Sequence, residues 1–184
     1  MLEGKIKHFV EMNKISKTGE VVFLGSTFFA GMDVAELAEN DNIDMMIYNR
    51  SFSKLSLDNA DSVLASCIYP LQPLKLFVNI GEEDLQLFNN DKDTFISKYE
   101  WMLLNIHRNC KNCSIYIVSI NSQKNNVNEM NETLENIAGD TGCIFIEINT
   151  GINHGTEISV FNKLKPYIRN FPITFSDAMN YQVG

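Results

Sequence analysis

Two hydroxyl side chains follow an apolar run near the start of the chain. The segment "EVVFLGSTFFAG" (residues 20–31) has the pattern of a buried strand that ends at Gly25 and is followed by Ser26 and Thr27. A hydroxyl at such a turn can attack a carbonyl carbon when a neighbouring base takes its proton. The alternative is that both hydroxyls cap the next helix or bond to amides of the turn.

The candidate bases are three histidines. His8 falls in the first helical pattern, and His107 falls late in a long helical pattern that leads back into a strand. Only His154, between Gly151 and Gly155, follows a strand-like run and is expected at the same edge of a sheet as the hydroxyls. It is therefore the one candidate for a substitute base, and the alternative is an exposed loop histidine.

The sequence predicts no metal and no cofactor. Cys110 and Cys113 form an isolated C-x-x-C without a second ligand pair, so we expect ordinary reduced cysteines. Gly25 and Gly31 lack the lysine that a phosphate-binding P-loop requires, and no G-x-G-x-x-G occurs. A mononucleotide site of the flavodoxin type stays open as an alternative on grounds of fold alone.

The elements that must position these residues alternate along the chain. Continuous apolar runs predict five strands, at residues 21–25, 45–49, 74–81, 114–120 and 143–148. Such runs suit parallel strands that are covered on both faces. Helical patterns lie before, between and after them, at residues 1–14, 33–40, 57–70, 93–109, 126–142 and 157–170. We expect an α/β fold, a three-layer flavodoxin-like sandwich with a five-stranded parallel sheet, in one domain over residues 1–184.

Local signals predict where several helices begin and end. Asp33 and Asp58 are the expected N-caps of the second and third helices, and Pro70 stops the third. The helix over 126–142 is expected to end at Gly139, and Pro166 to interrupt the last one. The helix over 93–109 places one set of apolar residues on a single face, which we expect to pack on the sheet: Phe95, Tyr99, Met102, Leu103 and Ile106.

Composition excludes some classes of partner. The net charge is −8 and the pI about 4.8, which argues against a nucleic-acid surface. The apolar runs are strand-sized, so no membrane span is expected. The N-terminus lacks a continuous apolar stretch, which predicts no signal peptide and a cytoplasmic protein. The sequence leaves the oligomeric state open.

Four blocks of the sequence, taken in order, resemble the SGNH (GDSL-type) hydrolase family. They read "FLGSTF" (23–28), "IYNRSFSKLSLD" (47–58), "LFVNIGEEDL" (76–85) and "FSDAMNYQ" (175–182), and they cover nearly the whole chain. The resemblance implies an SGNH-hydrolase-like sandwich and the hydrolysis of lipid or other acyl esters. In that family a serine of the first block attacks the acyl carbonyl, and a histidine three residues after an aspartate takes the proton.

The residues that the resemblance assigns to catalysis depart from this pattern. The nucleophile position falls on Thr27, and Ser26 stands where the family has aspartate. In the last block Asp177 matches the acid, whereas Asn180 replaces the base. A carboxamide cannot accept and release a proton near neutral pH.

The resemblance also implies a pocket that binds the oxyanion. Asn49 and Arg50 match the second block, and Gly81 and Asp84 match the third. Ser51 and Lys54 replace glycines, and Glu83 replaces the asparagine that donates to the oxyanion. Losing one such donor costs about 10²–10³ in rate. A carboxylate at about 4 Å adds a repulsion of roughly 4 kcal/mol at an effective dielectric constant near 20. Protonation of Glu83, or an ion pair with Lys54, would remove that repulsion.

The function expected from these blocks is an acyl-ester hydrolase by fold, weakly active or inactive because its catalytic serine, its histidine and its oxyanion asparagine are replaced. Its expected partner is a small acyl or ester ligand. The alternative is a non-catalytic module of the same fold that binds a small molecule or a protein.

Overall fold

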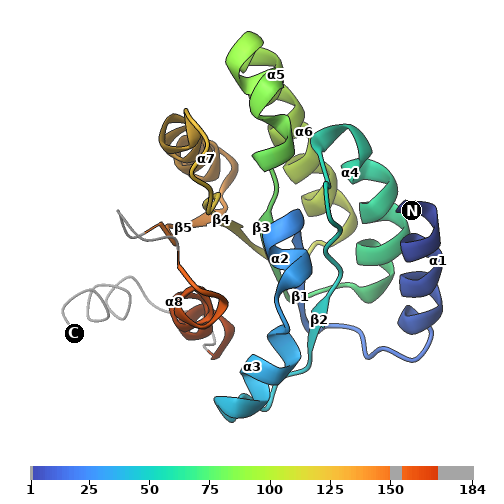
Figure 1. The fold of residues 1–184 in the computed structure, drawn as a ribbon. Coiled ribbons are helices and arrows are strands. Elements are labelled where there is room, and N and C mark those ends of the chain that lie inside the picture. The colour runs from blue at the N-terminus through green and yellow to red at the C-terminus, as the bar shows by residue number, and fades with distance from the viewer. Residues whose placement is uncertain (1, 150–154, 170–184) are drawn as a thin grey trace.

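The computed structural model describes residues 2–149 and 155–169. Five parallel strands form one sheet in the order β2-β1-β3-β4-β5, with helices on both faces (Figure 1). The predicted α/β class and the five-stranded parallel sheet are confirmed, with most strands shorter than their apolar runs. The strands are β1 (Val21–Gly25), β2 (Ile47–Asn49), β3 (Lys75–Asn79), β4 (Ser114–Val118) and β5 (Ile144–Ile146).

Helices fill the connections between the strands. The α-helices are α1 (Leu2–Asn13), α2 (Thr27–Gly31), α3 (Val34–Asn40), α4 (Leu57–Val63), α5 (Leu85–Asn90), α6 (Lys92–Asn109), α7 (Val127–Thr141) and α8 (Glu157–Arg169). A π-turn, η1 (Leu64–Ile68), and a 3₁₀ turn, η2 (Tyr69–Leu71), extend α4 toward β3. A second 3₁₀ turn, η3 (Glu82–Asp84), follows β3 and leads into α5.

Alternate residues of each strand face opposite sides of the sheet, which divides the core in two. Val22 and Leu24 of β1 pack in a first core with residues of α1, α4, α6 and α7. Val21 and Phe23 pack in a second core with residues of α2, α3 and α8. On that second side the rings of Phe23, Phe77 and Tyr116 stack across neighbouring strands, with centroids 4.8 and 4.7 Å apart. Figure 1 shows the two helical layers.

Two of the local predictions for helices are confirmed. The Asp33 carboxylate caps α3 and accepts from the Glu36 N–H at 3.1 Å. The predicted apolar face of α6 is buried from Phe95 to Ile106 against the first core. Both outcomes depend on near-neighbour patterns, which a sequence displays directly.

Three other local predictions are wrong. The N-cap of α4 is Ser56 and not Asp58, and the Asn59 side chain accepts from the Ser56 N–H at 3.1 Å. Helix α7 passes through Gly139 and ends at Thr141, and its C-cap is Gly142, whose φ of 70° suits a glycine after a helix. Helix α8 continues through Pro166 because its apolar face is packed in the second core.

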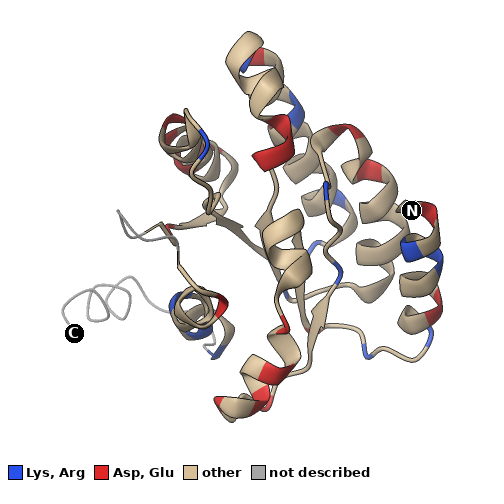
Figure 2. Cartoon of the chain, viewed as in Figure 1, with Lys and Arg blue, Asp and Glu red and all other residues tan. Residues whose placement is uncertain are grey.

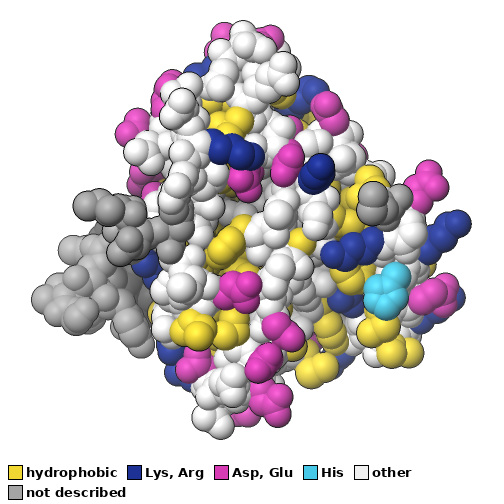
Figure 3. Space-filling view, in the orientation of Figure 1, with side chains coloured by type: hydrophobic (Ala, Val, Ile, Leu, Met, Phe, Trp, Pro, Cys, Tyr) yellow, Lys and Arg dark blue, Asp and Glu magenta, His cyan; other side chains and the backbone are white. Residues whose placement is uncertain are grey.

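Charged side chains are spread unevenly over the helices, and α2 and α5 carry none. Figure 2 shows acidic residues along α3 and both signs on α1, and Figure 3 shows basic side chains interspersed with acidic ones on the visible face. No helix among the described residues is long and apolar enough to cross a bilayer.

Candidate functional site

The carboxyl ends of β1 and β3 bring the first three sequence blocks together. Gly25 and Asn79 are partners in the parallel register of these strands. The Ser26 N–H donates to the Asn79 carbonyl at 2.9 Å, and the Phe52 N–H donates to the Gly25 carbonyl at 2.9 Å. Main-chain hydrogen bonds therefore join the turn after β1 to the other two blocks, at the edge of the sheet where parallel folds bind ligands.

Gly25 is required at this turn by close packing. A Cβ atom at this position would lie 2.8 Å from the Phe29 Cβ and 2.9 Å from the Asn79 carbonyl oxygen. Both distances are shorter than a side chain tolerates. The glycine lets the chain turn sharply from β1 into α2. This turn exposes the side chain of Thr27, two residues further along.

Thr27 is the first residue of α2, and its hydroxyl contacts the other two blocks. The hydroxyl donates to the Glu83 carboxylate at 3.4 Å and accepts from the Lys54 backbone N–H at 3.3 Å. These are long, weak hydrogen bonds at an exposed position. In Figure 2 the acidic turn η3 appears at the foot of α5, close to α2. The structure thus places Thr27, Lys54 and Glu83 in one cluster, here called the Thr27 cluster.

Lys54 contributes its backbone to this cluster. Its φ of 61° lies in the left-handed region that favours glycine. The chain therefore keeps the backbone conformation that a glycine would supply at this point of the second block. The expected alternative of a Lys54–Glu83 ion pair is wrong, since the ion pairs of the described part of the chain do not include it. The donor that faces Glu83 is the Thr27 hydroxyl.

Ser26 is not presented at the surface. It is 1% exposed, and its hydroxyl has no hydrogen-bond partner among the described residues. It occupies the N-cap position of α2 without a side-chain bond to the helix. The alternative that both hydroxyls cap the next helix or bond to turn amides holds for Thr27, whose hydroxyl accepts from the Lys54 N–H of a turn, and fails for Ser26, whose hydroxyl has no partner among the described residues. Of the two hydroxyls, only that of Thr27 is accessible to a ligand.

Two predicted pocket residues hold the backbone around α2. The Asn49 amide donates to the carbonyls of Phe29 and Met32 at 2.7 and 3.0 Å, and its oxygen accepts from the Ser51 N–H at 3.0 Å. Ser51 is buried, and its hydroxyl lies 3.4 Å from the Phe23 carbonyl. Both side chains are therefore occupied by main-chain partners and contribute to positioning the turn.

Gly81 and Asp84 shape the third block. Gly81 has a φ of 137°, a conformation that L side chains rarely adopt, and lies buried at the start of η3. Both carboxylate oxygens of Asp84 accept from the Leu57 N–H, at 3.1 and 3.2 Å, which ties η3 to the beginning of α4. Burial raises the pKa of Asp84 to about 6, and the hydrogen bond from Leu57 opposes that rise.

The sequence did not predict that Asp84 holds η3 against the beginning of α4. The residue matches the third block, which was the available signal, but nothing local to it indicates a partner 27 residues away. By contrast, Glu83 was singled out because it departs from the block. The structure separates the two neighbours, with Glu83 exposed beside Thr27 and Asp84 buried beneath.

The remaining candidates for acid and base lie outside the described residues. These are His154, Asp177 and Asn180. Of the other histidines, His107 is near the C-terminal end of α6, and its Nε2 lies 3.7 Å from the Cys143 Sγ. That end of α6 leads into the amino end of β4, so His107 belongs to the opposite edge of the sheet from Thr27.

The cysteines form no disulfide and no metal centre in the described part of the chain. All four are free thiols, Cys110 and Cys113 included. Burial raises the pKa of Cys110 to about 11 and that of Cys113 further still. Within residues 2–149 and 155–169, no three His, Cys, Asp or Glu side chains gather in a way that could hold an ion.

The sheet order, the two helical layers and the three converging blocks define the fold of the SGNH (GDSL-type) hydrolases. The chain superposes on a GDSL-like lipase from Bacteroides thetaiotaomicron with a TM-score of 0.63 and 13% identity, over 97% of this chain and 98% of that one. A protein from Streptococcus pneumonia, provisionally described as a platelet activating factor, gives a TM-score of 0.76 and 15% identity, over 90% and 92% of the two chains.

An acetylxylan esterase from Geobacillus stearothermophilus, in the form of a catalytic mutant, is also similar. Its TM-score is 0.60 and its identity 10%, over 84% of this chain and 94% of that one. Identities this low show a shared fold and nothing about activity. No protein-family model matches the sequence, and no curated protein sequence matches it. The chain is thus a divergent example of this fold.

Proposed function

We propose that this chain is an acyl-ester hydrolase by descent whose site at Thr27 has little or no turnover. The single observation that carries the proposal is the contact between the Thr27 hydroxyl and the Glu83 carboxylate at 3.4 Å. In the resembling family an amide donor stands at the Glu83 position. A carboxylate there is an acceptor, which reverses what the site offers to a substrate carbonyl.

The effect on the reaction rate of replacing a donor by the Glu83 carboxylate can be estimated. Attack on a carbonyl places negative charge on its oxygen, and a hydrolase stabilises that charge with fixed donors. At about 4 Å, an ionised Glu83 would repel the oxyanion by roughly 4 kcal/mol, which is a factor of about 10³ in rate. The loss of the amide donor contributes a further factor of about 10²–10³.

The nucleophile is also poorly activated. The Thr27 hydroxyl donates to a carboxylate, and a carboxylate is a weak base toward an alcohol. The methyl group of threonine further restricts χ1 and crowds the approach of a substrate. In the last block Asn180 stands where the resemblance places the histidine. Each of these changes opposes the transfer of the hydroxyl proton.

The test is covalent labelling by a fluorophosphonate, together with hydrolysis of a simple aryl acetate. We expect no adduct at Thr27 or Ser26 and a rate equal to that of the matched variants Thr27→Ala and Ser26→Ala. A mapped adduct at either hydroxyl, or turnover that either variant abolishes, would contradict the proposal. An active serine esterase treated in parallel shows that the probe and substrate are competent.

A second function, binding without catalysis, is supported by the preserved framework. The close-packed Gly25, the positive φ of Gly81 and the left-handed Lys54 maintain the turns of the three blocks although the reactive groups have changed. Such a site would bind a small acyl or ester ligand, or a protein. Stabilisation of the chain by short-chain esters in a thermal melt, without their hydrolysis, would support this function, and no shift at millimolar ester would count against it.

The setting of the proposed function is a single cytoplasmic domain without a cofactor or nucleic-acid partner. Four free thiols support a reducing compartment. Cell fractionation tests the location, and limited proteolysis, which should release no stable fragment, tests the single domain.

A further inference from the structure

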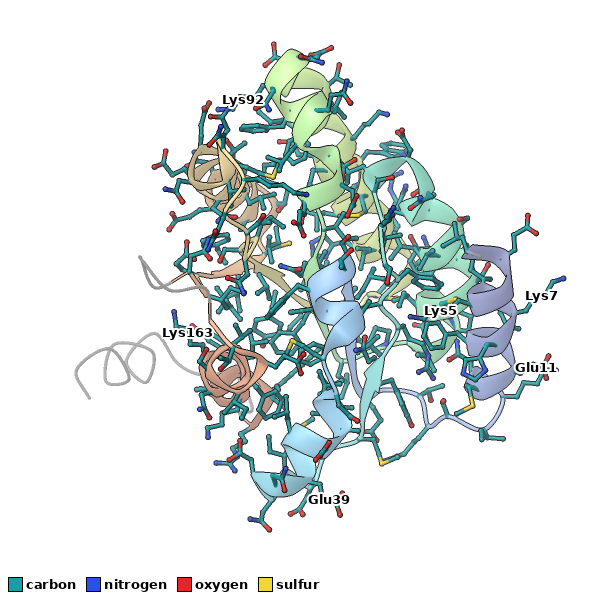
Figure 4. All side chains as sticks on the ribbon, in the orientation of Figure 1. Lys5, Lys7, Glu11, Glu39, Lys92 and Lys163 are labelled. Atoms are coloured by element: carbon teal, nitrogen blue, oxygen red, sulfur yellow. The ribbon has the colours of Figure 1, made fainter. Side chains whose placement is uncertain are left out.

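A groove separates α6 and α7 on the outer side of the first helical layer, away from the Thr27 cluster. It has a volume of about 530 Å³, which is in the range of small-molecule sites. Its walls are supplied by α6 and by the C-terminal end of α7. An ion pair between Lys92, which is labelled in Figure 4, and Glu129 at 3.0 Å joins the N-terminal ends of the two helices. The lining residues are Ser97, Glu100, Trp101, Leu104, His107, Asp140 and Thr141.

Two large apolar side chains line this groove in contact with solvent. Trp101 is 53% exposed and Leu104 is 42% exposed, although the next residues along α6, Met102 and Leu103, are buried. Neither exposed side chain contributes to the two buried cores. Exposed apolar residues scattered singly are ordinary, but a pair that shares a hollow of this size offers a ligand an apolar surface.

The charges of the groove favour a cation. Glu100 from α6 and Asp140 from α7 both line it, and neither forms an ion pair or a hydrogen bond with another described residue. The Trp101 ring already has a cation over it, because the Arg108 guanidinium lies 5.6 Å from the ring centroid. An indole face and two unpaired carboxylates together are a common means of recognising an ammonium group.

We propose that this groove binds a small organic ammonium ion. Its apolar body lies on Trp101 and Leu104, and its nitrogen lies between Glu100 and Asp140, where the net charge of −8 of the chain adds a favourable long-range field. The volume of about 530 Å³ suits a compact molecule and is too small for a docked helix. Arg108 is a competitor for the ring, and the ligand displaces it or uses the face that Arg108 leaves open.

The single tryptophan of the chain makes the test direct, because all indole fluorescence comes from Trp101. The probe is 2-phenylethylammonium, titrated into the full chain at low salt. Its neutral and anionic analogues, 2-phenylethanol and 3-phenylpropanoate, are the matched ligands. We expect a saturable change in emission with the ammonium ion and at least about tenfold weaker binding of both analogues.

Variants of exposed and half-buried residues that lie outside the two cores separate the contributions. Glu100→Gln with Asp140→Asn should weaken ammonium binding at least about fivefold, whereas Arg108→Ala should strengthen it by removing a like charge and a competitor. The control is Glu39→Gln, an exposed carboxylate on α3 (Figure 4), which should leave the titration unchanged. Trp101→Ala should abolish the binding heat measured by calorimetry.

Several results would overturn the proposal. Equal binding of ammonium and alcohol would mean a merely apolar groove. Tighter binding of 3-phenylpropanoate than of the ammonium ion, weakened in Arg108→Ala, would mean that the groove prefers an anion. No saturable change would mean that the groove binds no such ligand. Saturation only by a lysine-rich peptide would assign the groove to a peptide partner. A change in emission with protein concentration, in the absence of any probe, would assign it to a second copy of the chain. This test is independent of activity at Thr27.

Discussion

The Thr27 Oγ1 lies 3.4 Å from the Glu83 Oε1, and the Lys54 backbone N–H donates to the same hydroxyl at 3.3 Å. These three residues come from three separate sequence blocks, and each follows a different strand of the sheet. A backbone donor therefore still points at the hydroxyl, while the neighbouring side chain is an acceptor. The Thr27 hydroxyl is therefore the point at which the three blocks meet.

The effect of Glu83 on catalysis can be tested by Glu83→Asn. Removing the charge and supplying an amide donor should raise any residual aryl-ester turnover by a factor of about 10²–10³. This change does not alter Asn180, where the proposed function places the lost base, so we expect the rate to stay far below that of a complete hydrolase. The measurement is the initial rate of aryl acetate hydrolysis, with Thr27→Ala/Glu83→Asn as the control that loses the gain. A rate unchanged by Glu83→Asn alone would show that Glu83 does not limit the site.

The buried carboxyl of Asp84 should make stability depend on pH. Burial raises its pKa in the folded chain to about 6, above the ordinary value of 3.8. The folded state therefore binds more protons than the unfolded state between these pH values, and the free energy of unfolding falls as pH rises from about 4 to about 6. Above that window the loss is complete, and it amounts to at most about 3 kcal/mol.

Asp84→Asn isolates this contribution, because the amide oxygen can still accept from the Leu57 N–H. Urea unfolding of both proteins should show that the free energy of unfolding of the wild type falls relative to that of the variant between pH 4 and pH 6. This pH range is set by the raised pKa of Asp84. A constant difference across this range would mean that Asp84 titrates normally. The comparison cancels the carboxylates that both proteins share.

Gly25 and Gly139 should respond in opposite ways to the same substitution. In Gly25→Ala the new Cβ would lie 2.8 Å from the Phe29 Cβ, so we expect a loss of about 1–3 kcal/mol. Gly139→Ala meets open space inside α7 and should stabilise the chain by roughly 1 kcal/mol. Chemical denaturation measures both, and destabilisation by Gly139→Ala would argue against a continuous α7.

Lys54 should gain stability from becoming glycine. Its φ of 61° is unfavourable for a side chain, so Lys54→Gly should raise the free energy of unfolding by up to about 1 kcal/mol and keep the N–H bond to Thr27. Asn42→Gly is the matched control, since Asn42 has a similar φ of 53° but asparagine tolerates this region. In a thermal melt, a loss at Lys54 would contradict the left-handed assignment, and equal gains at both positions would mean that asparagine is tolerated there no better than lysine.

The sequence predicted the architecture well because buried parallel strands are continuous apolar runs. The strands β1 and β3 were found at their runs, and Gly25 marked the end of β1. Helix ends were less predictable. Helix α7 continues past Gly139 to Thr141 because packing of its apolar face outweighs the roughly 1 kcal/mol that an interior glycine costs.

The candidate site also has features that the sequence determined and features that only the tertiary structure decided. The sequence by itself determined which residue types stand in the blocks, including the departures at Thr27 and Glu83. Only the tertiary structure decided that Ser26 is buried, that the Lys54 backbone and not an ion pair faces Thr27, and that Asp84 binds a main-chain N–H of α4. Those outcomes depend on contacts between segments far apart in the chain, whose geometry no local pattern encodes.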